Sequence, residues 1–289
     1  MSEQFFSGWD FEHEEQDFKS MMDYQEFCGQ KFVYDWSEVR DKIYEESKKY
    51  SQWTHKKLPN YKYLQNKTNG CVSISANRTF ESQLDFANQK GREVKVFRGL
   101  PVWIYAAIHC GIHGRASSGG ASLSSAMQAI AKYGVLPQDT PGLPTNIFRD
   151  GTYIDGALSW NTSMSQWKEA HEKFGDKAIK LRMVVAMLPR NVEDVAACLK
   201  AGYPVNYGTD IKLRLQNGIY VPSGSTAHAM SYDGYYDSQY AGHWNSWGDG
   251  HGKVPFTTIK QQMSSRHWQG YVILDVERSD LSRGNETMF

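Results

Sequence analysis

Apolar residues in the front half of the chain recur at the spacing of a helix. In residues 72–87 four of them lie three or four positions apart, on what would be one helix face: Ala76, Phe80, Leu84 and Ala87. Similar patterns predict helices over residues 101–108 and 122–133. Gly134 follows the last of these, in the position that a C-terminal cap prefers. The front of the chain is therefore predicted to be mostly helical.

Behind residue 180 the pattern changes to runs of branched and aromatic residues, which are typical of strands. We expect strands over residues 181–188, 203–207, 227–235, 242–247 and 271–276. A helix is predicted among them at residues 192–201, and Asn191 precedes it as an N-terminal cap. A mostly helical half followed by a mostly sheet half predicts the α+β class.

The N-terminal segment sets aromatic side chains among aspartate and glutamate. We interpret residues 1–55 as an extension outside the main core, followed by a main domain over residues 56–278 and a C-terminal tail over residues 279–289. Apolar spacing over residues 36–50 predicts a helix that ends near Ser51. Three roles stay open for the extension: a peripheral helix without chemistry, a pro-segment, or an arm that docks a partner protein assembly.

Charge and hydropathy limit the classes of partner. The chain has 289 residues, of which 40% are hydrophobic, so it can bury a substantial core. Lysine plus arginine total 32 and aspartate plus glutamate total 32, so no net charge attracts nucleic acid. The apolar runs are far shorter than the roughly 20 residues that cross a bilayer. We therefore expect neither a nucleic-acid partner nor a membrane span.

The N-terminus and the cysteines favour a reducing compartment. The first residues lack the basic start and the apolar stretch of a secretion signal. The four cysteines lack the dense spacing of a small disulfide-stapled domain: Cys28, Cys71, Cys110 and Cys198. We expect free thiols and a cytoplasmic location.

Cys71 directly precedes the helix predicted for residues 72–87. A thiol is a useful nucleophile only as the thiolate, and the unpaired N–H groups and positive dipole end of a helix N-terminus lower its pKa. Such a nucleophile also needs a histidine as base and a third polar side chain that orients the imidazole. The sheet half offers His228 and Asn245, whose separation along the chain suits a hairpin that returns one to the other.

At these residues the chain resembles the papain family of cysteine peptidases. The family carries a histidine between small residues, here in Ala227-His228-Ala229, and further downstream the run Asn-Ser-Trp-Gly, here residues 245–248. The interval from Cys71 to His228 is close to the roughly 130–150 residues of the family. The resemblance covers residues 58–276. It implies a papain-like fold with a helical lobe, a twisted antiparallel sheet or barrel lobe, and the site in the cleft between them.

The resemblance also implies roles for single residues. Cys71 would be the nucleophile, His228 its base and Asn245 the residue that orients the histidine. Gln65, which lies six positions before Cys71, would form the oxyanion hole with the Cys71 backbone N–H. Trp247 would shield the contact between Asn245 and His228 from water.

Gly119 and Gly120 resemble the glycine pair with which the family binds the main chain of an extended peptide. Val72 stands where the family usually has tryptophan. The function implied is hydrolysis of peptide bonds in a peptide or protein substrate, through a thioester acyl-enzyme and without a cofactor or metal.

Two alternatives stay open. Papain-like proteins without disulfides also occur in tailed phages and bacteria, so the fold could serve as a structural or docking protein, for example a virion-associated component, whose catalysis is lost or incidental. Separately, His109, Cys110 and His113 have side chains that can ligate zinc, and Cys110 is an alternative nucleophile. No second ligand pair with clear spacing accompanies them, so the prediction contains no metal site.

Overall fold

A computed structural model describes residues 8–58, 68–143, 158–186, 190–247 and 250–276. The α-helices are α1 (Glu14–Cys28), α2 (Trp36–Ser47), α3 (Cys71–Gln89), α4 (Pro101–Ala106), α5 (Leu123–Tyr133), α6 (Met164–Phe174), α7 (Val192–Lys200) and α8 (Phe256–Met263). A π-helical segment, η1 (Ala107–Ile112), continues α4, and a 3-10 turn, η2 (Gly175–Lys177), continues α6. The strands are β1 (Val33–Asp35), β2 (Leu181–Ala186), β3 (Val205–Gln216), β4 (Ile219–Tyr235), β5 (Tyr240–Asn245), β6 (Gly250–Pro255) and β7 (Gln269–Val276). The predicted α+β class is confirmed.

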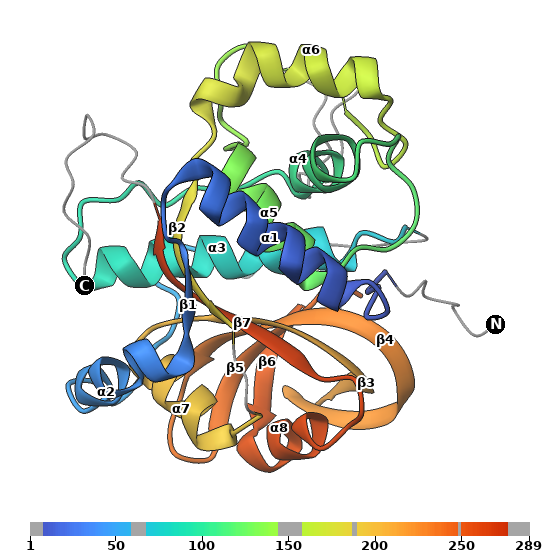
Figure 1. Ribbon diagram of the computed structural model, residues 1–289. Coiled ribbons are helices and arrows are strands. Elements are labelled where there is room, and N and C mark those ends of the chain that lie inside the picture. The colour runs from blue at the N-terminus through green and yellow to red at the C-terminus, as the bar shows by residue number, and fades with distance from the viewer. Residues whose placement is uncertain (1–7, 59–67, 144–157, 187–189, 248–249, 277–289) are drawn as a thin grey trace.

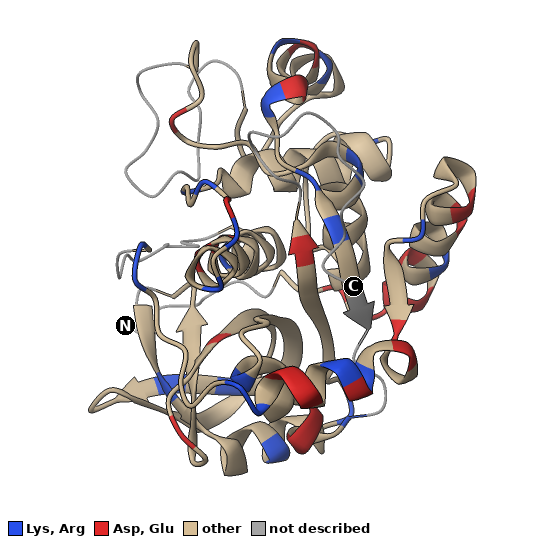
Figure 2. Cartoon of the chain, turned by 90° about the vertical axis from the view of Figure 1, so that its left-hand side faces the viewer, with Lys and Arg blue, Asp and Glu red and all other residues tan. Residues whose placement is uncertain are grey.

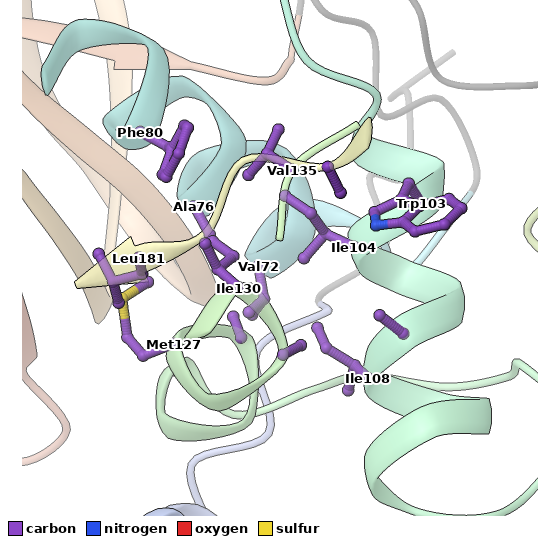
Figure 3. Close-up of a cluster of buried hydrophobic side chains, with 14 of the residues drawn as sticks. Val72, Ala76, Phe80, Trp103, Ile104, Ile108, Met127, Ile130, Val135 and Leu181 are labelled. Carbon is purple, nitrogen blue, oxygen red and sulfur yellow. The ribbon is translucent and has the colours of Figure 1, made fainter. Parts of the chain in front are cut away.

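Two clusters of buried hydrophobic side chains give the molecule a helical part and a sheet part. In Figure 1, α1, α3, α4, α5 and α6 lie above strands β3 to β6, and α7 and α8 lie below. The helical cluster takes side chains from α3, α4, η1 and α5, and Figure 3 shows them gathered around one centre. Val72 of α3 is among them. The sheet cluster takes side chains mainly from α2, α7, α8 and the strands.

The strands form one seven-stranded sheet in the order β1-β2-β7-β3-β4-β5-β6. Neighbouring strands are antiparallel except β1 and β2, which are parallel. β4 also pairs with β6 through Ile219 and Lys253, so the last three strands curl toward one another. The sheet as a whole stays open between β1 and β6, and the closed barrel considered from the resemblance is therefore not formed.

α3 runs between the two parts and begins at Cys71, as predicted. Every residue over positions 71–87 is buried, so the helix is enclosed on all sides. The single apolar stripe read from the sequence understates this burial, because polar side chains on the other faces bond to neighbouring elements. Arg78 Nε donates to Asp233 of β4 at 2.9 Å, and Gln83 Nε2 donates to the Leu274 carbonyl of β7 at 2.9 Å.

The expectation that residues 1–55 lie outside the main core is wrong for their described part. Trp9, Met21 and Phe32 belong to the helical cluster, and α1 packs against α5. β1 joins the sheet by pairing Val33 with Val184 of β2. Among the aromatic residues that suggested a separate arm, Trp9 lies in this cluster, and Phe11, Phe18 and Tyr24 pack against it.

Local capping signals in the sequence agree with the structure where they were used. The Asn191 side chain accepts the Glu193 N–H at 2.9 Å at the start of α7, and Gly134 follows α5 with a positive φ of 75°. Helix α2 ends at Ser47, one turn earlier than expected. The sequence patterns did not predict α1, α6, α8 or β6.

Charged residues of both signs are interspersed along the chain in Figure 2. No helix in the described part of the chain is both long and apolar enough to span a bilayer. The four cysteines are all free thiols.

Candidate active site

Cys71 is the first residue of α3, where helix N–H groups have no partner within the helix. Its thiol is fully buried. The backbone N–H groups of Ala229, Gly8 and Val72 are directed at the sulfur. Because Ala229 directly follows His228 on β4, the fold brings the two predicted catalytic residues to the same junction of α3 and the sheet.

His228 is fully buried on β4 and is held by Asn245 of β5. Its Nε2 lies 2.8 Å from Asn245 Oδ1, so Nε2 carries the proton that the carboxamide oxygen accepts. Nδ1 has no hydrogen-bond partner among the described residues. An imidazole in this tautomer offers Nδ1 as a proton acceptor, which is the form that a general base requires.

Trp247 covers the histidine. Its ring is stacked on the His228 ring with centroids 4.0 Å apart and an interplanar angle of 16°, and the ammonium of Lys212 lies 5.4 Å from the Trp247 ring centroid. The indole therefore keeps water away from the hydrogen bond between His228 and Asn245, and a dry hydrogen bond fixes the ring more firmly than a solvated one.

Burial keeps the Cys71 thiol and the His228 imidazole neutral in this conformation. Burial raises the pKa of the Cys71 thiol to about 11, although the surrounding backbone N–H groups oppose the rise. Burial lowers the pKa of His228 to about 4; the hydrogen bond that His228 donates to Asn245 opposes this, and the Lys212 charge lowers the pKa further. At neutral pH the pair is therefore thiol and neutral imidazole, not thiolate and imidazolium.

Residues 8–10 form an isolated β-bridge with Ala121 beside the thiol. The Ala121 N–H donates to the Gly8 carbonyl at 2.9 Å, and the Asp10 N–H donates to the Ala121 carbonyl at 2.8 Å. The bridge between Trp9 and Ala121 is parallel. A Cβ placed on Gly120 would come within 2.8 Å of the Gly8 carbonyl. The glycine predicted to bind substrate main chain thus contacts the chain's own N-terminal segment.

Side chains anchor this segment at two further points. The Trp9 indole lies on Gly208 of β3, where an added Cβ would come within 2.5 Å of the ring. The Glu14 carboxylate accepts the N–H groups of Leu123 and Ser124 at 2.8 Å each, at the N-terminus of α5. Burial raises the pKa of Glu14, and these hydrogen bonds oppose the rise. Trp9 and Glu14 are both nearly fully buried.

Of the predicted site residues, Cys71, His228, Asn245 and Trp247 come together here. Gly119 has a positive φ of 76°, and its carbonyl accepts the Tyr105 hydroxyl at 3.0 Å. Gln65 lies outside the described residues. Tyr105 was not predicted as a site residue. Its pKa is raised to about 12, first by burial and then by the nearby Cys71.

Gly8 and Trp9 were also missed, because no local pattern links them to a site so far along the sequence. A periodicity argument treats each window separately and carries no information on such pairings.

The His109, Cys110 and His113 group lies on the π-helical segment and its C-cap. The Cys110 thiol donates to the Thr162 carbonyl at 3.5 Å, and the ring centroids of His109 and His113 are 5.8 Å apart. Burial lowers the pKa of His109 to about 3. In the described part of the chain these three side chains do not converge on one point as metal ligands would.

Comparison with known proteins gives matches in structure only. No protein-family model matches the chain, and no curated protein sequence matches it. The proform of the Amb a 11 cysteine protease, a major ragweed pollen allergen, aligns with a TM-score of 0.52 and 15% identity over 76% of this chain and 67% of that one. Xylellain, a cysteine protease from Xylella fastidiosa, aligns with a TM-score of 0.48 and 18% identity, over 78% of this chain and 91% of that one. Procathepsin L 3 of the Tenebrio molitor larval midgut aligns with a TM-score of 0.46 and 15% identity, over 91% of each chain.

The chain therefore has a papain-like fold, as predicted, with its seven-stranded sheet left open.

Proposed function

We propose that this protein is a cysteine-type endopeptidase in which Cys71 is the nucleophile, His228 the base and Asn245 the residue that orients the base. One observation carries the proposal: His228 Nε2 is bonded to Asn245 Oδ1 at 2.8 Å beneath Trp247, while its Nδ1 has no partner in the described part of the chain. The N–H of the next residue, Ala229, is directed at the Cys71 sulfur.

The chemistry follows from this arrangement. His228 Nδ1 takes the Cys71 thiol proton while the sulfur forms a bond to the substrate carbonyl carbon. The tetrahedral intermediate breaks its C–N bond, and His228 gives its proton to the leaving amine. Water, deprotonated by His228, then attacks the thioester, and the released thiolate regains a proton as the acid departs. Asn245 keeps the ring in the one tautomer that serves all four proton transfers.

Two further roles belong to the proposal. Gln65, six positions before Cys71, would donate to the oxyanion together with the Cys71 N–H, each donor being worth roughly 10²–10³ in rate. Gly119 and Gly120 would bind the main chain of an extended peptide or protein substrate as an added strand. Gln65 lies outside the described residues, so its role rests on its place in the sequence.

We also propose that residues 8–10 hold the enzyme in a latent state. They bond to Ala121, beside the glycine pair, and the Gly8 N–H is directed at the sulfur, so substrate and this segment compete for one surface. Of the roles left open for residues 1–55, the pro-segment reading fits these contacts, since the segment docks on its own chain. Displacing it would expose the thiol to water and lower its pKa toward the ordinary value.

The test compares thiol labelling in the full-length chain and in a Trp9→Glu variant. The substitution places a carboxylate against Gly208 and should displace residues 8–10 from the site. We expect an epoxide-type thiol reagent to label Trp9→Glu much faster than the parent chain, as measured by intact mass. All variants carry Cys28→Ser, because Cys28 is an exposed free thiol; labelling should then disappear with Cys71→Ala and persist with Cys110→Ala. Phe27→Glu is the matched control, because Phe27 is 88% exposed on α1 and does not touch the site.

The alternative is a structural or docking protein, including a virion-associated one, whose catalysis is lost. The full burial of Cys71 and the raised pKa of its thiol favour this reading. If a folded Trp9→Glu variant takes up no reagent at Cys71, the peptidase proposal fails and the structural role replaces it.

A further inference from the structure

A second group of buried polar side chains lies further along β4. His55, Asp233 and His251 each offer one ligand atom, and these atoms all lie within 4.8 Å of one another. His55 Nε2 is 3.1 Å from Asp233 Oδ2, and His251 Nε2 is 2.9 Å from Asp233 Oδ1. The three residues come from three segments: the stretch after α2, the end of β4 and β6.

We propose that His55, Asp233 and His251 bind a divalent transition-metal ion, with Zn²⁺ as the best match. Two imidazole nitrogens and one carboxylate oxygen are borderline ligands of the kind that zinc prefers, with a fourth position left for water. Zinc bonds of about 2.0–2.2 Å in a tetrahedral site put ligand atoms about 3.3 Å apart. The contacts of His55 and His251 with Asp233, 3.1 and 2.9 Å, are close to that spacing, and no two of the ligand atoms are more than 4.8 Å apart.

The three side chains have charged and hydrogen-bonding neighbours of the kind that surround protein metal sites. His55 Nδ1 lies 3.3 Å from Asp85 Oδ2, so this carboxylate faces the ring nitrogen opposite the proposed ligand atom Nε2, as outer-shell carboxylates do for metal-bound histidine. Asp85 Oδ2 itself accepts the N–H of Lys56 at 3.0 Å and that of Lys57 at 3.2 Å. Arg78 Nε donates to Asp233 Oδ2 at 2.9 Å, which leaves Oδ1 as the ligand atom.

The charge balance also favours a cation. Asp85 and Asp233 are both fully buried, and Arg78 supplies one positive charge against their two negative ones. The positive charge still needed can come from a metal ion or from a proton on one of the two histidines. These two possibilities predict different responses to added metal, which makes the proposal testable.

The site is distinct from the one proposed for peptide hydrolysis and does not rest on that proposal. Asp233 lies five positions beyond His228, which corresponds to about 17 Å along a strand. A metal ion would join the segment that carries His55 to the two strands that carry Asp233 and His251. Trp53 already pairs with Tyr235 of β4 through two backbone hydrogen bonds, so the ion would fix the next turn of the same segment.

The experiment is calorimetric titration of Zn²⁺ into full-length protein carrying Cys28→Ser and Cys71→Ala, which remove the exposed thiol and the proposed nucleophile. We expect one ion per chain, a higher melting temperature with zinc, and the intense visible absorption of a tetrahedral ion when Co²⁺ replaces Zn²⁺. His251→Asn and His55→Asn should abolish binding. Asp85→Asn should weaken it by roughly 10–100-fold.

His13→Asn is the matched control, because the His13 side chain is 62% exposed and lies outside the cluster; it should bind zinc as the parent does. Circular dichroism without metal identifies variants that fold, and His251→Asn, at the more exposed ligand, tests the site if His55→Asn does not fold. Absence of a one-to-one binding heat, or an unchanged affinity in His251→Asn, would overturn the proposal and assign the cluster to ion pairs with a protonated imidazole.

Discussion

Strand β4 carries His228 and, five positions further on, Asp233, and α3 packs along both. Cys71 at the start of α3 lies at the His228 end, and Arg78, two turns later, lies at the Asp233 end. Each oxygen of Asp233 has a partner: Arg78 and His55 on Oδ2, and His251 on Oδ1. His228 has a single neutral partner, and its second nitrogen has none within the described chain.

This difference separates a stabilising cluster at Asp233 from the site at His228 that we propose to be reactive. A buried carboxylate satisfied by opposite charges holds elements together, and its pKa is driven far down; burial opposes this, but His251, Arg78 and His55 outweigh it. A buried imidazole with one unpaired nitrogen lowers the stability of the fold. Such a cost is retained at functional sites, and we propose that this nitrogen of His228 is the general base. The two ends of β4 should therefore respond in opposite ways to substitution.

The largest effect is expected at the reactive end. In the Trp9→Glu background, His228→Ala should lower kcat/KM on a peptide substrate by roughly 10²–10⁴, the usual contribution of general acid–base catalysis. Circular dichroism should show a folded protein. Hydrolysis at the parental rate by a folded His228→Ala variant would remove His228 from the mechanism.

At the other end the loss should appear in stability. Arg78→Met leaves Asp233 without its guanidinium partner, and breaking a buried pair in this way costs about 3–5 kcal/mol in the free energy of unfolding. Urea unfolding measures the loss. Arg40→Met is the control, since Arg40 is half exposed and its Nε lies 3.8 Å from Asp194 Oδ1. Its loss should lower the free energy of unfolding by less than about 1 kcal/mol. Equal losses of unfolding free energy in Arg78→Met and Arg40→Met would show that the Asp233 end of β4 does not stabilise the fold more than a surface ion pair does.

The difference extends to pH. The pKa of His228 is lowered from 6.5 to about 4 in the fold, so the unfolded chain binds a proton first as pH falls. Stability should therefore drop between pH 6.5 and pH 4, by up to about 3 kcal/mol from this residue at 1.36 kcal/mol per pKa unit. Above pH 6.5 the contribution is constant.

His228→Gln should flatten the pH dependence in that window, as seen in urea midpoints measured at pH 7, 5.5 and 4. His13→Gln is the control, because the pKa of that exposed residue is raised, not lowered, by its hydrogen bond to Asp10. An unchanged slope in His228→Gln would show that the ring is not kept neutral by burial.

The sequence patterns drew attention to the His228 end of β4 and gave no sign of the cluster at the Asp233 end. The small residues around His228 and the Asn-Ser-Trp-Gly run are local patterns, and the start of α3 at Cys71 follows from apolar spacing. His55, Asp233 and His251 show no such pattern, since they meet only after three distant segments pack. The same holds for Trp9 and Gly208, whose contact joins the start of the described chain to β3 and depends on tertiary packing, which no single window of sequence reports.

The smallest effect is expected for the residue that orients the base. Asn245→Ala removes one neutral hydrogen bond, worth about 1 kcal/mol net, so kcat in the Trp9→Glu background should fall by only about fivefold. KM should stay constant, because Asn245 acts on His228 and not on the substrate. Asn206→Ala is the matched control: Asn206 is a buried carboxamide on β3 with no partner for its side chain in the described residues. A fall in kcat for Asn245→Ala but not for Asn206→Ala assigns the effect to the histidine. If both variants fall alike, the loss is one of packing, and the hydrogen bond between His228 and Asn245 has no part in catalysis.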